Sequence, residues 1–155
     1  MNKIIFTIFF FAFFTVLNAS NVIACSCVPQ GSESIETQVK EAFTNSTAVF
    51  VGEVVEVIEK PDAFSVEVKF KVVKSWKNEF EDTVSITTGR GGGDCGYHFE
   101  VGKKYLIYAG GDKHNLKTNI CTRTSAFESN KDVAFLNKMK KMKKIKKSKI
   151  KSSPK

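Results

Sequence analysis

The clearest pattern in the chain is a strict alternation of apolar and polar residues over residues 64–72. Such alternation is typical of an antiparallel strand with one face in a core and the other in water. Residues 83–88 alternate in the same way, residues 48–59 are dense in valine, and residues 104–109 form another short apolar segment. We therefore predict a strand in each of these four segments and a fifth strand around residues 118–121.

Glycine and proline positions predict where these strands turn or bend. Lys60-Pro61-Asp62 and Gly110-Gly111-Asp112 are predicted turns between strands. Gly52 lies inside a predicted strand and indicates a bulge or bend of the kind that a barrel needs at its corners. Residues 89–94 contain four glycines and are predicted to form a flexible loop that ends at Cys95.

One helix is predicted before the first strand. Residues 31–43 carry an apolar face at helical spacing and follow two candidate N-caps, Ser32 and Ser34; the face consists of Ile35, Val39, Ala42 and Phe43. Five short strands with one or two flanking helices predict a mainly β fold, a small closed barrel of five antiparallel strands.

The N-terminus has the features of a cleavable signal peptide over residues 1–24. Lys3 precedes an apolar run at residues 4–17, and small residues lie at the −3 and −1 positions before Cys25. The run of 14 residues is shorter than the roughly 20 that span a bilayer as a helix. We expect a secreted, extracellular protein that begins at Cys25. The alternative is a lipobox at residues 22–25, which would give a membrane-anchored lipoprotein acylated on Cys25.

The charge is divided between an acidic domain and a basic C-terminal segment. The chain has a net charge of +8, but of its 24 basic residues Lys3 lies in the leader and ten lysines lie in residues 138–155. That leaves 13 basic residues against 16 acidic ones in residues 25–137, a net charge of −3. The excess of acid argues against nucleic acid as a partner. We predict one domain over residues 25–130.

Residues 131–155 form a lysine-rich tail with an apolar residue at every third position from Leu136 to Ile145. A frayed, solvated tail is the first expectation for such a sequence. A basic amphipathic helix that contacts an anionic membrane or polysaccharide is the alternative.

Four cysteines follow the predicted cleavage site: Cys25, Cys27, Cys95 and Cys121. An even number in an exported chain predicts two disulfides. Cys25 and Cys27 are too close in sequence to pair readily with each other, so each is expected to pair with Cys95 or Cys121. A reduced Cys-x-Cys metal site is the alternative, and thiol titration distinguishes the two.

The cysteine motif and several other motifs, in the same order, resemble one known family. The motifs are Cys25-Ser26-Cys27-Val28-Pro29, residues 70–77, Cys95-Gly96, residues 101–107 and Asn119-Ile120-Cys121. Together they are similar to the N-terminal domain of the tissue inhibitors of metalloproteinases (TIMP), within the netrin-like (NTR) module group. The resemblance covers residues 25 to about 127. It implies an OB-like barrel with the disulfides Cys25–Cys95 and Cys27–Cys121.

The resemblance also implies inhibition of a zinc metalloprotease. The α-amine and carbonyl of Cys25 would chelate the zinc of the target, and the chain would hold no cofactor of its own. Ser26 would enter the specificity pocket of the protease, and Cys27, Val28 and Pro29 would lie along its cleft. Gly93 and Asp94 would form a secondary contact loop.

The chain departs from the family in lacking a third core disulfide and a cysteine-rich C-terminal domain. Its glycine-rich loop before Cys95 also predicts a looser contact with a protease, because ordering that loop costs entropy. No catalytic motif is recognisable, so we do not expect an enzyme, and His98 and His114 are predicted to be surface residues. The main alternative is a secreted or lipid-anchored netrin-like binding module that does not inhibit proteases. We expect a monomer.

Overall fold

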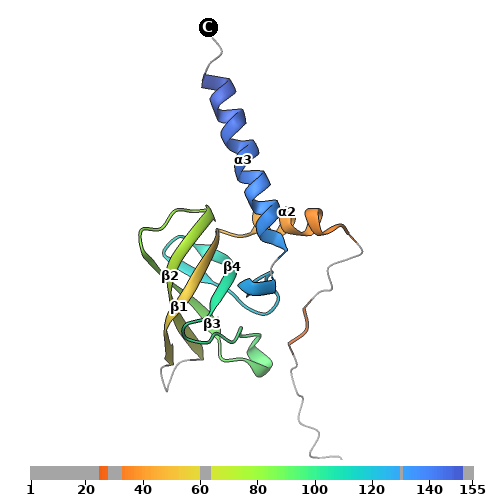
Figure 1. Ribbon diagram of the computed structural model, residues 1–155. Helices are drawn as coiled ribbons and strands as arrows, with labels where there is room; N and C mark the ends of the chain where they lie inside the picture. The colour runs from red at the N-terminus through yellow and green to blue at the C-terminus, as the bar shows by residue number, and fades with distance from the viewer. Residues whose placement is uncertain (1–24, 28–32, 60–63, 130, 152–155) are drawn as a thin grey trace, which may run out of the picture.

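Five strands close into a barrel with two helices on its outside (Figure 1). The fold is a computed structural model that describes residues 25–27, 33–59, 64–129 and 131–151. The barrel strands are β1 (Ala48–Glu59), β2 (Ser65–Lys77), β3 (Thr83–Gly89), β4 (Lys104–Asp112) and β5 (Asn115–Lys117). The predicted leader, Val28, Pro29 and the predicted turn at residues 60–62 lie outside the described residues.

The strand order around the barrel is β1-β2-β3-β5-β4, and β4 pairs with β1 to close it. All of these pairings are antiparallel except that of β3 with β5, which is parallel and consists of the single pair Thr87 and Lys117. The predicted mainly β barrel is confirmed, with this one mixed pairing as a difference. A two-residue strand, β6 (Ser125–Ala126), adds to β4.

The fifth strand lies three residues earlier than predicted. The carboxylate of Asp112 accepts hydrogen bonds from the backbone N–H groups of His114 (2.9 Å) and Asn115 (2.8 Å), so the chain reverses at once. Gly111 therefore belongs to β4, where it pairs with Leu116, and not to a turn. The predicted strand at residues 118–121 forms a turn instead, in which the side chain of Asn119 accepts from the N–H groups of residues 121 and 122.

The barrel buries two apolar clusters, one inside it and one beneath the helices. Phe50, Phe70 and Ile107 belong to the inner cluster, whereas Val49 and Tyr108 belong to the outer one. Because successive side chains of a strand point to opposite faces, β1 and β4 contribute to both clusters. This explains why β1 is apolar throughout its first residues while β2 alternates.

One of the register irregularities of β1 falls at Gly52, where the sequence predicts a bulge or bend. The register of β1 against β2 shifts between Val51 and Gly52. A Cβ atom at position 52 would lie 2.9 Å from the Cβ of Phe70, so the two strands approach closely only because this residue is glycine.

Helix α2 (Ile35–Asn45) begins after Ser34, whose hydroxyl accepts a hydrogen bond from the N–H of Thr37 (3.2 Å). Of the two predicted caps, Ser34 has this role, and Ser32 lies outside the described residues. Val39 is fully buried against the barrel, whereas Ile35, at the start of the predicted apolar face, is 49 % exposed.

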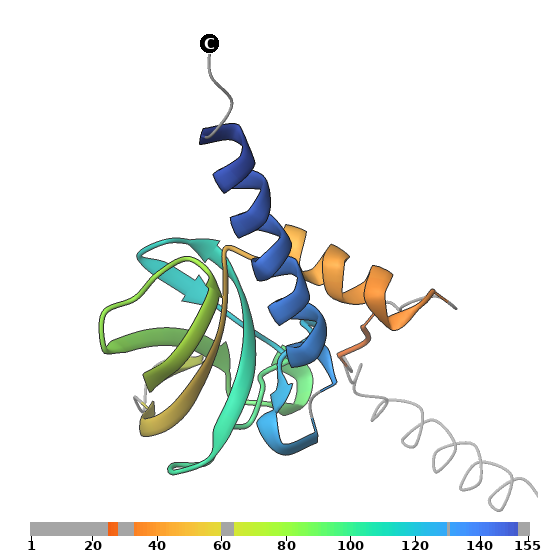
Figure 2. The ribbon, with the colours of Figure 1, turned by 45° about the horizontal axis from the view of Figure 1, so that its top comes forward.

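The C-terminal segment forms helix α3 (Asp132–Lys151). Leu136 is fully buried in the outer cluster, so the first turns of α3 are part of the packed domain and the expectation of a frayed tail is wrong for them. The helix lies across α2, and its lysine-rich half projects away from the barrel (Figure 2). Among the described residues, no helix is long and apolar enough to cross a membrane.

Candidate functional site

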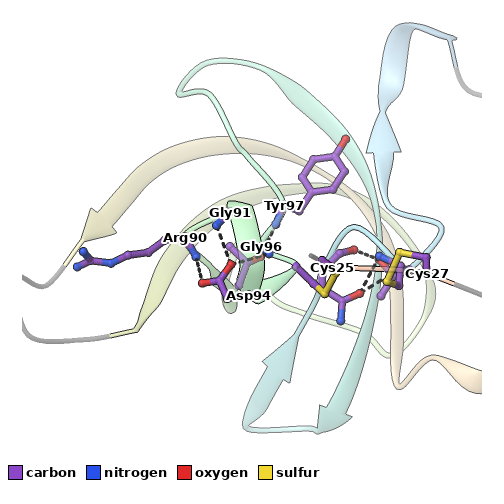
Figure 3. Close-up of a disulfide and its surroundings, with 12 residues drawn as sticks. Cys25, Cys27, Arg90, Gly91, Asp94, Gly96 and Tyr97 are labelled. Carbon is purple, nitrogen blue, oxygen red and sulfur yellow. Dashed lines mark hydrogen bonds between the residues drawn. A yellow bond between two sulfur atoms is a disulfide. The ribbon is translucent and has the colours of Figure 1, made fainter. Parts of the chain in front are cut away.

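Two disulfides fix the segment Cys25–Ser26–Cys27 to one end of the barrel (Figure 3). Cys25 pairs with Cys95 and Cys27 pairs with Cys121, with Cα–Cα distances of 5.3 and 5.1 Å. Spacing alone left open which cysteine of the first pair joins which of the second. The structure has the pairing that the TIMP resemblance implies.

The residue between the two disulfides faces outward. Cys25 and Cys27 are half-buried, whereas Ser26 is exposed. The two disulfides therefore hold the residues on either side against the protein and leave residue 26 exposed to solvent.

The two loops that hold the segment are joined to each other. The N–H of Ile120 donates to the carbonyl of Cys95 (2.9 Å), and the N–H of Thr118 donates to the carbonyl of Thr87 in β3 (3.0 Å). The two loops that carry Cys95 and Cys121 are therefore joined by backbone hydrogen bonding, and the 25–27 segment is attached to both of them.

The glycine-rich loop before Cys95 folds around the carboxylate of Asp94. Gly92–Asp94 form a short 3-10 turn, and the Asp94 carboxylate accepts from the backbone N–H groups of Arg90 (2.7 Å), Gly91 (2.8 Å) and Gly96 (3.0 Å). These hydrogen bonds lower the pKa of Asp94 below its ordinary value, and those from Arg90 and Gly96 contribute most to the lowering. Asp94 was predicted as a contact residue, and in the structure its carboxylate organises its own loop.

A close backbone approach at Gly96 and a hydrogen bond from Tyr97 also hold this loop against β3. A Cβ atom at Gly96 would lie 2.2 Å from the carbonyl carbon of Gly89, so only glycine allows the loop to lie against the end of β3. The N–H of Tyr97 donates to the hydroxyl of Thr88 (2.8 Å). Cys95 itself adopts a left-handed conformation with φ of 60°. That conformation costs an L-residue about 1–2 kcal/mol, which the surrounding bonds must offset.

A buried ionic network, which the sequence did not predict, links the loop that carries Cys121 to both helices. Arg123, two residues after Cys121, forms an ion pair with Asp132 at 2.6 Å and donates to the side chain of Gln38 on α2 (2.8 Å). Tyr108 donates to the same carboxylate at 3.1 Å. Burial, together with the negative charge of Asp132, raises the pKa of Tyr108 far above its ordinary value. The only sequence signal was an acidic residue at the start of a helix, which is common on surfaces.

Three sulfur atoms lie together at the site. The Sγ atoms of Cys25, Cys27 and Cys121 are within 4.8 Å of one another, a spacing that thiolates would need to share a metal ion. All three sulfurs are in disulfides, however, and a disulfide sulfur is not a thiolate ligand. The bond to Cys95 also uses the Sγ that a lipid thioether would need, so acylation of Cys25 and this disulfide exclude each other.

The structure brings together only part of the predicted site. Cys25, Ser26 and Cys27 lie next to the loop that carries Gly93 and Asp94, and Val28 and Pro29 lie outside the described residues. His98 and His114 are exposed, as predicted for surface residues.

Comparison with protein-family models and with curated proteins identifies no relative of the chain. The sequence matches no protein-family model, and no curated protein is similar to it at a significant level.

Proposed function

We propose that the chain is a secreted inhibitor of zinc metalloendopeptidases that acts through the backbone of Cys25 after cleavage behind Ala24. The observation that carries the proposal is the pair of disulfides two residues apart, which holds the 25–27 segment against the loops of Cys95 and Cys121 with Ser26 exposed.

Cleavage would create the metal-binding group. While residue 24 is attached, the nitrogen of Cys25 is an amide and has no lone pair available to a metal. A free α-amine has a pKa of about 7.7–8.0, so near neutral pH it needs little free energy to release its proton to solvent and bind a zinc ion. The amine and the carbonyl of the same residue can form a five-membered chelate.

A metalloprotease offers a matching position. Its catalytic zinc has three protein ligands and an open position that holds the attacking water. An amine and carbonyl delivered to that zinc would displace the water, so that no nucleophile remains to attack the peptide bonds of the bound segment. Ser26 would enter the specificity pocket, and Cys27, Val28 and Pro29 would follow along the cleft.

The tethers make such a short ligand competent to bind. Ordering a free peptide costs about 1–2 kcal/mol of backbone entropy per residue. The disulfides at residues 25 and 27 impose this cost on folding, not on binding, and the ordered Asp94 loop removes a further part.

The experiment compares three purified proteins against a panel of zinc endopeptidases with a fluorogenic peptide substrate. One begins at Cys25, one carries an additional alanine before Cys25, and the control carries the same alanine after Lys155. The added N-terminal residue converts the amine of Cys25 into an amide, which cannot bind the zinc. Inhibition should therefore weaken at least about a hundredfold, which corresponds to about 2.7 kcal/mol of binding free energy. The C-terminal addition should change nothing.

Intact mass and circular dichroism establish that all three proteins have both disulfides and the same fold. Equal inhibition by the N-terminally extended protein contradicts chelation through Cys25. Absence of inhibition by all three, with the fold intact, favours the alternative of a netrin-like binding module.

A further inference from the structure

An apolar groove with a lysine rim lies between α2, the end of β2 and α3. Its volume is about 640 Å³, and its apolar lining includes Phe43, Trp76, Met139, Met142 and Ile145. Met142 and Ile145 are 52 % and 49 % exposed, so the apolar lining continues onto the open surface of α3.

The charged residues that line the groove are all basic: Lys40, Lys140 and Lys143. The ammonium groups of Lys77 and Lys143 both lie 5.3 Å from the ring of Phe43, at the edge of the groove. Burial, and then the charge of Lys143, lowers the pKa of Lys77. The ammonium group of Lys77 donates to the backbone carbonyls of Phe43 and Thr44 (2.9 Å each), so the exposed Lys143 is the cation of this pair that is presented to an anion.

The basic character continues along α3. From residue 138 to its end at Lys151 the helix contains nine lysines and no acidic residue. Twenty residues of α-helix extend about 30 Å. Clusters of four to eight basic residues on an amphipathic helix are typical of segments that bind anionic lipid head groups.

We propose that α3 and this groove dock the protein onto the surface of an anionic membrane. The lysines contact lipid phosphates, and Met142 and Ile145 enter the boundary between head groups and acyl chains. The net charge of −3 on residues 25–137 directs the barrel away from the same surface, so the docked orientation is defined.

Two other occupants fit less well. A second copy of the chain would bring its own nine lysines against these, which is repulsive. A sulfated polysaccharide would satisfy the lysines but would leave the exposed side chain of Met142 and the apolar groove in water. A bilayer satisfies both parts.

Docking through α3 leaves the Cys25 site accessible. Arg123 joins the loop of Cys121 to Asp132, the first residue of α3, so the site lies beside the start of the helix. The lysine-rich half projects in the other direction (Figures 1 and 2). Membrane docking and protease inhibition use different residues, and each assay can fail without the other.

The test uses the only tryptophan of the chain, Trp76, which lines the groove, as the reporter. Purified protein is titrated with vesicles of phosphatidylcholine containing about one-third phosphatidylglycerol, or of phosphatidylcholine alone. Intact mass first establishes that Cys25 carries no lipid. We expect Trp76 emission to shift to shorter wavelength only with the anionic vesicles, to be quenched by brominated acyl chains, and to recover in high salt.

Charge reversal on α3 is compared with an equal change on the barrel. The triple variant Lys141→Glu, Lys144→Glu and Lys147→Glu should bind about a hundredfold more weakly, since each lysine near an anionic surface contributes about 1 kcal/mol. The control changes Lys71, Lys103 and Lys113, all exposed on the barrel, to glutamate. It alters the net charge equally and should retain most of the binding.

The apolar contribution is tested by replacing Met142 and Ile145 with serine, which should reduce binding about tenfold and abolish quenching by brominated lipid. Circular dichroism verifies that α3 is retained in every variant. Equal binding to neutral vesicles, an equal loss in the barrel control, or binding of a sulfated polysaccharide without binding of anionic vesicles overturns the proposal.

Discussion

The two disulfides at the candidate site should be thermodynamically coupled, because their cysteines lie close together in sequence at one end. Cys25 and Cys27 are two residues apart, and Cys95 and Cys121 are 26 apart. When Cys25–Cys95 is intact, the second disulfide closes a ring of only about 30 residues through the first. When it is absent, Cys27–Cys121 closes a loop with a sequence separation of 94.

These ring sizes give different stabilities for the same bond. The chain-entropy relation gives about 3.6 kcal/mol for a 30-residue ring and about 4.7 kcal/mol for the longer loop at 25 °C. Replacing Cys27 and Cys121 with serine should therefore cost about 1 kcal/mol more in a background that already lacks Cys25–Cys95. The effect that each substitution has on native packing by itself cancels in the difference, which then contains the ring term together with the direct coupling of the neighbouring cysteine sites.

The assay is equilibrium unfolding in guanidinium chloride of the four members of this cycle, all with an equal concentration of a stabilising osmolyte so that the disulfide-free form folds. The free energy of unfolding is compared within each background. If removal of Cys27–Cys121 costs the same in both backgrounds, the two disulfides act independently and the ring argument is wrong.

Three further predictions concern how the site and α3 are held. Leu136→Ala, at a fully buried position, should lower the free energy of unfolding, measured in urea, by about 2–5 kcal/mol. Met142→Ala, at an exposed position of the same helix, should change it by less than about 0.5 kcal/mol. Equal effects of the two substitutions would mean that α3 is not docked on the barrel. Because the pKa of Asp94 is lowered, its carboxylate contributes fully to the stability of the folded protein above its ordinary pKa, and this contribution is lost as the pH falls through the lowered value. Between about pH 5 and about pH 2, wild type should therefore lose more stability in thermal melting than Asp94→Asn. An equal loss in the two proteins would refute this. Gly96→Ala forces a Cβ atom into the backbone of β3 and should reduce the yield of correctly paired disulfides, measured by peptide mapping. Gly110→Ala, where the added Cβ meets open space, should leave that yield unchanged. Normal disulfide pairing in Gly96→Ala would contradict the close approach of residue 96 to β3.

The sequence predicted those parts of the fold that repeat a pattern over several residues. The bounds of β1 were predicted correctly at residues 48–59, and β2 was located by its alternation although it extends further, to Lys77. The three residues of β5 are too few to show periodicity, and their position depends on the hydrogen bonds of Asp112, so this strand was misplaced. Its parallel pairing with β3 is a consequence of barrel closure, which no local pattern encodes.

The candidate site shows the same division. The sequence by itself predicted that two disulfides would attach the 25–27 segment to the body, because four cysteines follow the predicted leader and the first two cannot readily pair with each other. Residue spacing did not decide the partners, since that depends on which loops lie side by side at the end of the barrel. Composition likewise suggested a flexible glycine loop and a frayed lysine tail. Only the tertiary structure places the Asp94 carboxylate among three backbone N–H groups and Leu136 in the outer cluster, since both contacts join residues through the folding of the whole chain.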